Sequence, residues 1–141
     1  MAVEKQVPVK DESRVPIQSD LDIVTARQRG RALAQRLGFS DSSLTMIATA
    51  ISELARNILL YAKKGEMTVG IVEDNGLRGI TVVAKDEGPG IRDVDRAMEV
   101  GYSTSGSLGL GLPGVRRLMD DFEIVSRPGR GTTVTARKWK R

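Results

Sequence analysis

Apolar residues recur at helical spacing in two long stretches of the first half of the chain. Between residues 20 and 38 they return every three or four positions, which predicts a helix that ends at Gly38, where glycine suits a left-handed C-cap. Between residues 40 and 62 they form a stripe typical of a helix packed on a core, namely Ile47, Ile51, Leu54, Ile58 and Tyr61. Two lysines and a glycine at 63–65 close this second predicted helix.

Strand-like stretches follow, arranged as two hairpins. The stretches 67–73 and 79–85 flank Asp-Asn-Gly at 74–76, which is a strong signal for a hairpin turn. The stretches 122–127 and 132–139 flank a turn that contains two glycines. In the last stretch the period-two alternation places four residues on a single face, namely Thr132, Val134, Ala136 and Lys138.

The first 18 residues are predicted to form an arm that precedes one domain over residues 19–141. Apolar residues spaced by two, together with two prolines, indicate that the second part of the arm forms an edge strand. At 141 residues the chain is long enough to bury one sizeable core, and a second domain is not needed.

The composition excludes several kinds of chemistry, because the chain contains no cysteine and no histidine. Disulfides, zinc sites of the usual ligands, cysteine nucleophiles, Ser-His dyads and phosphohistidine are all ruled out. The sequence shows neither a signal peptide nor a long apolar run, so we expect a cytoplasmic protein that does not enter a membrane. The net charge is +4, partly from basic residues at 137–141, but no nucleic-acid-binding motif accompanies them, so nucleic acid is not an expected partner.

A carboxylate and a carboxamide stand four residues apart in the second predicted helix, at Glu53 and Asn57. At this spacing the two side chains share a face of the helix, beside the apolar stripe. Such a pair suits the wall of a binding pocket. Both residue types are usually exposed, so a merely solvated pair is the alternative interpretation.

The first hairpin leads into a turn with the sequence DEGPGI at 86–91. Its two glycines and its proline predict a tight turn that lets the backbone approach a flat ligand closely. An ionised Asp86 only accepts hydrogen bonds, which suits an exocyclic amino group such as that of adenine. Thr132 opens the last strand, and its hydroxyl would reach the same ligand if the two strands are neighbours. An ordinary loop and an ordinary strand threonine are the alternatives.

A glycine-rich segment, GYSTSGSLGLGLPG at 101–114, lies between short helices expected over 93–100 and 112–119. Amides at the start of the second of these helices would suit phosphate oxygens. The segment is not a Walker A loop, because no lysine follows its glycines, and no strand feeds it as in a Rossmann fingerprint. Phosphate charge would therefore be met by backbone amides and a metal ion, with Asn57 as an uncharged oxygen ligand for Mg²⁺.

Four pieces in this order resemble the GHKL ATP-binding superfamily: the helix with SELARN, the turn DEGPGI, the glycine-rich GLGLPG and a Gly-Thr pair before the last strand. The resemblance covers about residues 21–138. It implies the Bergerat fold, an α/β fold of the two-layer α+β sandwich type in which helices cover one face of a mixed, mostly antiparallel sheet. ATP would bind between the helices and a glycine-rich lid.

The resemblance also implies roles for particular residues. Asn57 would bind Mg²⁺ and the nucleotide, Glu53 would be the catalytic general base, and Asp86 would contact adenine. The remaining nucleotide-binding positions would shape the adenine pocket and the lid, namely Gly88, Gly90, Gly106, Gly109, Leu110, Gly111 and Thr132. In histidine kinases of the superfamily a basic residue follows the Mg²⁺ ligand by three positions, whereas here that residue is Leu60, and the lid also lacks a basic residue. Arg56 or a residue of the protein substrate would then stabilise the γ-phosphate.

Within the superfamily, SELARN, DEGPGI, YSTSG and GLGLPGVRRLMD are similar to the anti-sigma-factor type of serine/threonine kinases, in particular to switch kinases of the stressosome. This implies phosphorylation of STAS-domain scaffold and antagonist proteins, followed by activation of a PP2C-type phosphatase through partner switching in a stress response. Two alternatives remain open. One is an ATP-gated protein-binding module without phosphoryl transfer, and the other is an ATPase that dimerises for mechanical work.

Overall fold

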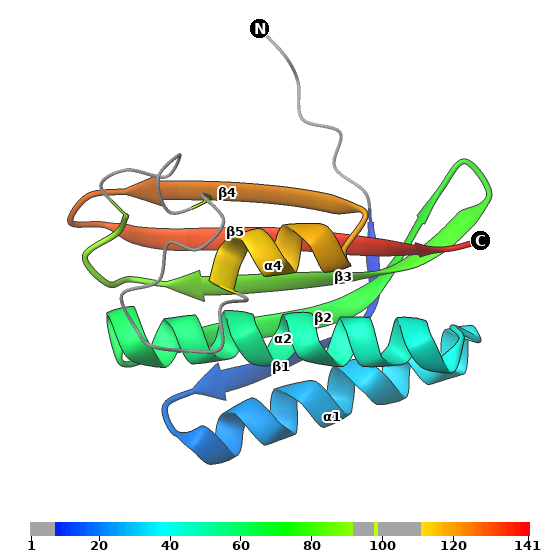
Figure 1. Cartoon of the computed structure of the whole chain (residues 1–141), viewed down its shortest axis with the longest axis horizontal. Helices are drawn as coiled ribbons and strands as arrows, with labels where there is room; N and C mark the ends of the chain where they lie inside the picture. Colours follow the sequence, from blue (N-terminus) through cyan, green and yellow to red (C-terminus); the bar gives the residue numbers. More distant parts are fainter. Residues whose placement is uncertain (1–7, 92–97, 99–110) are drawn as a thin grey trace, which may run out of the picture.

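The computed structural model describes residues 8–91, residue 98 and residues 111–141. Among these residues three helices lie on one face of a sheet, as Figure 1 shows, so the expected two-layer arrangement is confirmed. The predicted helix at 93–100 falls outside the described residues except at Met98. In chain order the elements are β1 (Val9–Ile17), α1 (Asp20–Leu37), α2 (Asp41–Ala62), β2 (Gly65–Asp74), β3 (Leu77–Asp86), α4 (Gly111–Leu118), β4 (Asp121–Arg127) and β5 (Gly131–Lys140).

The five described strands form one sheet in the order β1-β2-β3-β5-β4. All four pairings are antiparallel, so the parallel part of the expected mixed sheet does not occur among the described strands. The two predicted hairpins are β2–β3 and β4–β5, and the second part of the N-terminal arm forms the edge strand β1. The strand β5 lies between β3 and β4, although it comes last in the sequence.

Local sequence determines where the two long helices begin and end. At the start of α1 the Asp22 carboxylate accepts hydrogen bonds from the Gln18 and Ser19 amides, which satisfies backbone donors that precede the helix. At its end Gly38 adopts the left-handed conformation, with φ of 88°. Ser40 caps the start of α2, since its hydroxyl accepts a hydrogen bond from the Ser43 amide. Lys63 caps the end of α2 and is a non-glycine residue with a positive φ of 70°.

The hydrophobic core lies between the helices and the sheet. From α2 it takes the buried residues Ile47, Ile51, Leu54 and Ile58, as the apolar stripe predicted. Tyr61 was assigned to the same stripe, and that assignment is wrong, because half of Tyr61 is exposed. The Ile58 side chain already lies against Gly65, the first residue of β2, so Tyr61 stands about one turn beyond the ends of the strands.

Candidate functional site

One end of the molecule brings together the C-terminal part of α2, the end of β3 and the turn between β4 and β5 (Figure 1). A Cβ on Gly65 would stand 2.7 Å from Ile58 of α2 and 3.2 Å from the Asp86 Cβ. The C-terminal part of α2 and the end of β3 are therefore neighbours in space. The folding of the chain creates a candidate site at this end.

Glu53 is buried on α2, with only 6% of its surface exposed. Its Oε1 accepts a hydrogen bond of 2.6 Å from the guanidinium of Arg56, one turn further along the helix. The interpretation of Glu53 as a merely solvated residue is therefore wrong. A buried carboxylate requires a partner, and the ion pair with Arg56 provides one. Arg56 contacts only Oε1, and Oε2 has no partner among the described residues.

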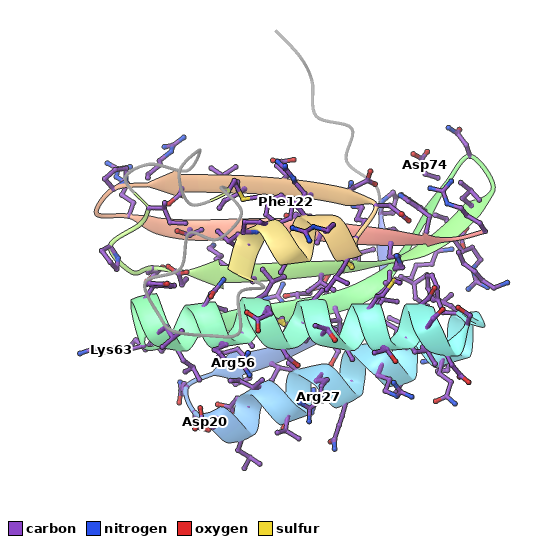
Figure 2. The ribbon with its side chains drawn as sticks, viewed as in Figure 1. Asp20, Arg27, Arg56, Lys63, Asp74 and Phe122 are labelled. Atoms are coloured by element: carbon purple, nitrogen blue, oxygen red, sulfur yellow. The ribbon has the colours of Figure 1, made fainter. Side chains whose placement is uncertain are left out.

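Asn57 is half-buried on the same face of α2 as Glu53. Figure 2 places Arg56 and Lys63 along this C-terminal part of the helix. Asn57 precedes Ile58, the residue that contacts the start of β2. Its carboxamide oxygen is a suitable ligand for a hard cation such as Mg²⁺. The donor set on this face, a carboxamide beside a carboxylate, fits the cation that the sequence pattern indicated.

The Asp86 carboxylate is held from one side by two backbone amides. Its Oδ1 accepts hydrogen bonds from the Gly88 amide at 2.9 Å and from the Thr132 amide at 3.3 Å. Its Oδ2 has no partner among the residues that the structure describes. The two amides orient the carboxylate, and the second oxygen remains available to accept a hydrogen bond from a ligand.

Thr132 lies directly opposite Asp86 in the pairing of β3 with β5, so the two strands are neighbours as the prediction required. The Thr132 hydroxyl is 2.8 Å from the Ser126 hydroxyl on β4. Ser126 also accepts a hydrogen bond of 2.7 Å from the Ile91 amide, at the end of the DEGPGI turn. Three separate segments of the chain thus meet through these two hydroxyl groups.

The two glycines predicted to shape the pocket allow the turn to pack closely against other segments. A Cβ on Gly88 would stand 2.6 Å from the Cβ of Ala62, so the turn contacts the last residue of α2. Gly90 has φ of 78° and packs against the Arg127 carbonyl at the end of β4. Close by, the Gly129 amide donates a hydrogen bond of 2.7 Å to the Pro89 carbonyl. The turn is therefore fixed on both sides.

Behind this site is a shallow depression of about 180 Å³. It opens on the face of the sheet that no described helix covers, since Lys85, Val125 and Thr133 alternate with the helix-facing residues Asp86, Ser126 and Thr132. Glu53 and Asn57 are not part of its lining. Its lining residues are Lys85, Asp86, Glu87, Val125, Arg127, Arg130, Gly131, Thr132 and Thr133.

The structure describes only part of the predicted lid. Gly106, Gly109 and Leu110 lie outside the described residues. Gly111 is the first residue of α4 and has a positive φ of 48°. The helix predicted at 112–119 is confirmed as α4, which packs on α2.

One residue of the site was not singled out from the sequence, namely Ser126. Ser126 lies on the helix-facing side of β4, at every second position with Phe122 and Ile124. A serine in this series of apolar residues is the sequence signal that could have identified it. Gly131 has φ of 113°, and a Cβ at this position would overlap the carbonyl oxygen of Asp86. The sequence marked Gly131 as part of the Gly-Thr pair before the last strand, whereas this close approach of two backbones depends on their register.

The fold is that of the histidine kinase-like ATPase class of domains. The model of the histidine kinase-like ATPase domain matches residues 17–138, nearly the whole chain, and this chain belongs to that family. The resemblance seen in the sequence is thereby confirmed. Among the described residues, no helix combines the length and apolar character needed to cross a membrane.

Within this family, the chain is similar to a serine/threonine-protein kinase and to anti-sigma F factors. The chain is 53% identical over 133 residues to the serine/threonine-protein kinase RsbT of Bacillus subtilis, covering 94% of this chain and 100% of that protein. It is 34% identical over 121 residues to the anti-sigma F factor of Caldanaerobacter subterraneus subsp. tengcongensis, covering 81% and 82% of the two chains. The anti-sigma F factor of Geobacillus stearothermophilus is 28% identical over 120 residues, covering 80% and 81%. These matches support ATP use and protein kinase activity in this chain.

Proposed function

We propose that this chain is a cytoplasmic serine/threonine protein kinase that transfers the γ-phosphoryl group of Mg-ATP to STAS-domain partner proteins of a stressosome. Once released from them, it binds and activates a PP2C-type phosphatase, so that phosphorylation switches its partner. The observation that carries the proposal is the match to a serine/threonine-protein kinase along 94% of the chain. The site geometry supports it independently, because Glu53 is a buried carboxylate on α2 and Asp86 is oriented by two backbone amides.

The proposal places the adenine base against Asp86 and Thr132. The free Oδ2 of Asp86 accepts a hydrogen bond from the amino group of adenine, while Oδ1 stays bound to two backbone amides. The backbone of Gly88 and Gly90 forms the edge of this pocket, and the lid residues Gly106, Gly109, Leu110 and Gly111 close over the phosphates. Guanine would present a carbonyl oxygen where adenine has its amino group, and the carboxylate would repel it.

Glu53 is the proposed general base for phosphoryl transfer. As the hydroxyl oxygen of the acceptor serine or threonine bonds to the γ-phosphorus, the bond from that phosphorus to the bridging oxygen breaks and ADP leaves. The hydroxyl proton moves to the free Oε2 of Glu53, while Arg56 holds Oε1. Mg²⁺, held by the Asn57 oxygen, would supply charge neutralisation at the phosphates. Because the lid has no basic residue, Arg56 or a residue of the protein substrate would offset charge on the transferred group.

Partner switching follows from the charge that the reaction adds to the substrate. A phosphoserine carries a charge of about −2 at neutral pH. In the interface with the kinase this charge lies close to Glu53 and repels it, so the phosphorylated partner binds more weakly than the unphosphorylated one. The kinase is thereby released and becomes available to its second partner.

The test is transfer of radiolabel from γ-labelled ATP to purified STAS-domain partner proteins in the presence of Mg²⁺. We expect labelling of the partner by the unaltered chain and a loss of at least about 100-fold for Glu53→Gln, the range that removal of a general base produces. Glu66→Gln is the matched control, since Glu66 is an exposed glutamate on β2 whose ion pair with Arg14 lies away from this site. It should label the partner normally.

Two results would contradict the proposal. Undiminished transfer by Glu53→Gln would remove Glu53 from the role of base. Saturable ATP binding without any transfer to these partners would instead support an ATP-gated binding module. Glu53→Gln must also remain folded, which urea denaturation checks.

A further inference from the structure

We infer that Ser126 is a positioning residue for nucleotide recognition, because its hydroxyl can donate to the Thr132 hydroxyl and so leave the Thr132 proton for a ligand. This inference rests on the proposed function, in which Asp86 and Thr132 receive the adenine base. Ser126 itself lies on β4, on the far side of Thr132 from Asp86, since β5 separates β4 from β3. It therefore acts on the ligand through Thr132.

The argument begins with the number of hydrogen bonds that a serine hydroxyl makes. It donates one proton and accepts at two lone pairs. The Ile91 amide, at 2.7 Å, occupies one lone pair of the Ser126 oxygen. The single proton of Ser126 then has two possible acceptors, the Thr132 hydroxyl oxygen at 2.8 Å and the Gly131 carbonyl oxygen at 3.3 Å.

A ligand that accepts the Thr132 proton selects donation from Ser126 to Thr132, and the 2.8 Å contact allows this because either hydroxyl can be its donor. Hydrogen bonds between oxygens lie mostly between about 2.5 and 3.0 Å, so the contact of 2.8 Å is well formed and the contact of 3.3 Å is weak. When Ser126 donates to Thr132, the Thr132 oxygen accepts and its own proton is free. If Ser126 donated to Gly131 instead, Thr132 would have to donate to Ser126 and would have no proton for a ligand.

The consequence is a paired pattern of donor and acceptor at the floor of the pocket. Asp86 presents an acceptor through Oδ2, and Thr132, directly opposite it in the strand pairing, presents a donor. Adenine carries the complementary pair, because its amino group donates and the ring nitrogen beside it accepts. Ser126 thus allows Thr132 to donate to the base without touching the base itself.

A double-mutant cycle of Ser126→Ala and Thr132→Val, read out as the Kd for Mg-ATP by calorimetric titration, tests the inference. One neutral hydrogen bond corresponds to a change of about 3- to 10-fold in affinity, so each single substitution should weaken binding by this factor. If Ser126 acts through Thr132, the double variant should bind within about 2-fold of Thr132→Val alone. A purely structural role for Ser126 would make the two effects multiply.

Two further variants keep the test independent of folding. Ser126→Thr retains the hydroxyl and should bind Mg-ATP like the unaltered chain. Thr135→Val removes a hydroxyl from the other face of β5 and should leave the Kd unchanged. Urea denaturation without nucleotide confirms that all variants are folded.

The outcomes separate this inference from the proposed function. Normal binding by Ser126→Ala, or effects that multiply in the double variant, would overturn the inference while the proposed function stands. Failure of the unaltered chain to bind Mg-ATP would overturn both.

Discussion

Replacement of Asp86 by asparagine changes what the candidate site offers a ligand while it preserves the local fold. The asparagine carbonyl oxygen can take the place of Oδ1 and accept the hydrogen bonds from the Gly88 and Thr132 amides. The amide nitrogen then replaces Oδ2, so the atom that faces the ligand becomes a donor instead of an acceptor. A donor there opposes the amino group of adenine.

The size of the effect follows from these contacts. A hydrogen bond to a charged group contributes about 1.5–3 kcal/mol, so its loss should weaken Mg-ATP binding by about 10- to 150-fold. Stability should change less, by about 1 kcal/mol, because both amides keep a neutral acceptor. Asp86→Ala is different, since it leaves two amides without their acceptor and should lower the free energy of unfolding by about 2–4 kcal/mol.

Calorimetric titration of Mg-ATP, combined with urea denaturation of the same samples, measures both quantities. Glu87→Gln is the matched control, because it removes the same charge from the next residue, whose side chain is exposed. It should bind Mg-ATP as the unaltered chain does. If Asp86→Asn bound Mg-ATP with unchanged affinity, or if Glu87→Gln lost as much affinity as Asp86→Asn, adenine recognition by Asp86 would be refuted.

Two further predictions concern backbone positions near the site, each read out by urea denaturation. Gly131→Ala should lower the free energy of unfolding by about 2–4 kcal/mol, because φ is 113° and the added Cβ overlaps the Asp86 carbonyl. Gly129→Ala, with φ of 78° and open space around the added Cβ, should cost only about 1 kcal/mol, and equal losses for the two would contradict the steric argument. Lys63→Gly should raise the free energy of unfolding by about 0.5 kcal/mol. Glycine removes the strain of a φ of 70°, and part of this gain is offset because glycine loses more conformational entropy on folding. A loss of stability in Lys63→Gly would show that Lys63 is not strained.

Much of the fold could be predicted because the responsible signals are local. The apolar spacing of α2, the Asp-Asn-Gly turn and the alternation in β5 each operate within a few residues, and each matches the structure. The extent of the stripe on α2 could not be predicted. Whether Tyr61 is buried depends on where the strands beneath the helix end, which is a tertiary property.

The candidate site was predictable by residue type and less so by environment. The pairing of Asp86 with Thr132 was expected only on the condition that their strands are neighbours, and the structure meets that condition. The burial of Glu53 could not be predicted from the sequence of the helix, because glutamate is usually exposed. An arginine three residues further along, as at Arg56, is also common on exposed helix faces. The role of Ser126 is visible only from its three contacts, and all three come from other segments of the chain.

The position of β5 has a consequence for chain synthesis. β5 follows the other described strands in the sequence and therefore leaves the ribosome after them, yet it lies inside the sheet between β3 and β4. Until it is in place, β4 has no strand to pair with and Asp86 lacks the Thr132 amide, which comes from 46 residues further along the chain. A ligand that requires both residues binds the completed fold and no nascent intermediate. Such a ligand adds its binding free energy only to finished molecules, and by mass action it protects them from unfolding and degradation.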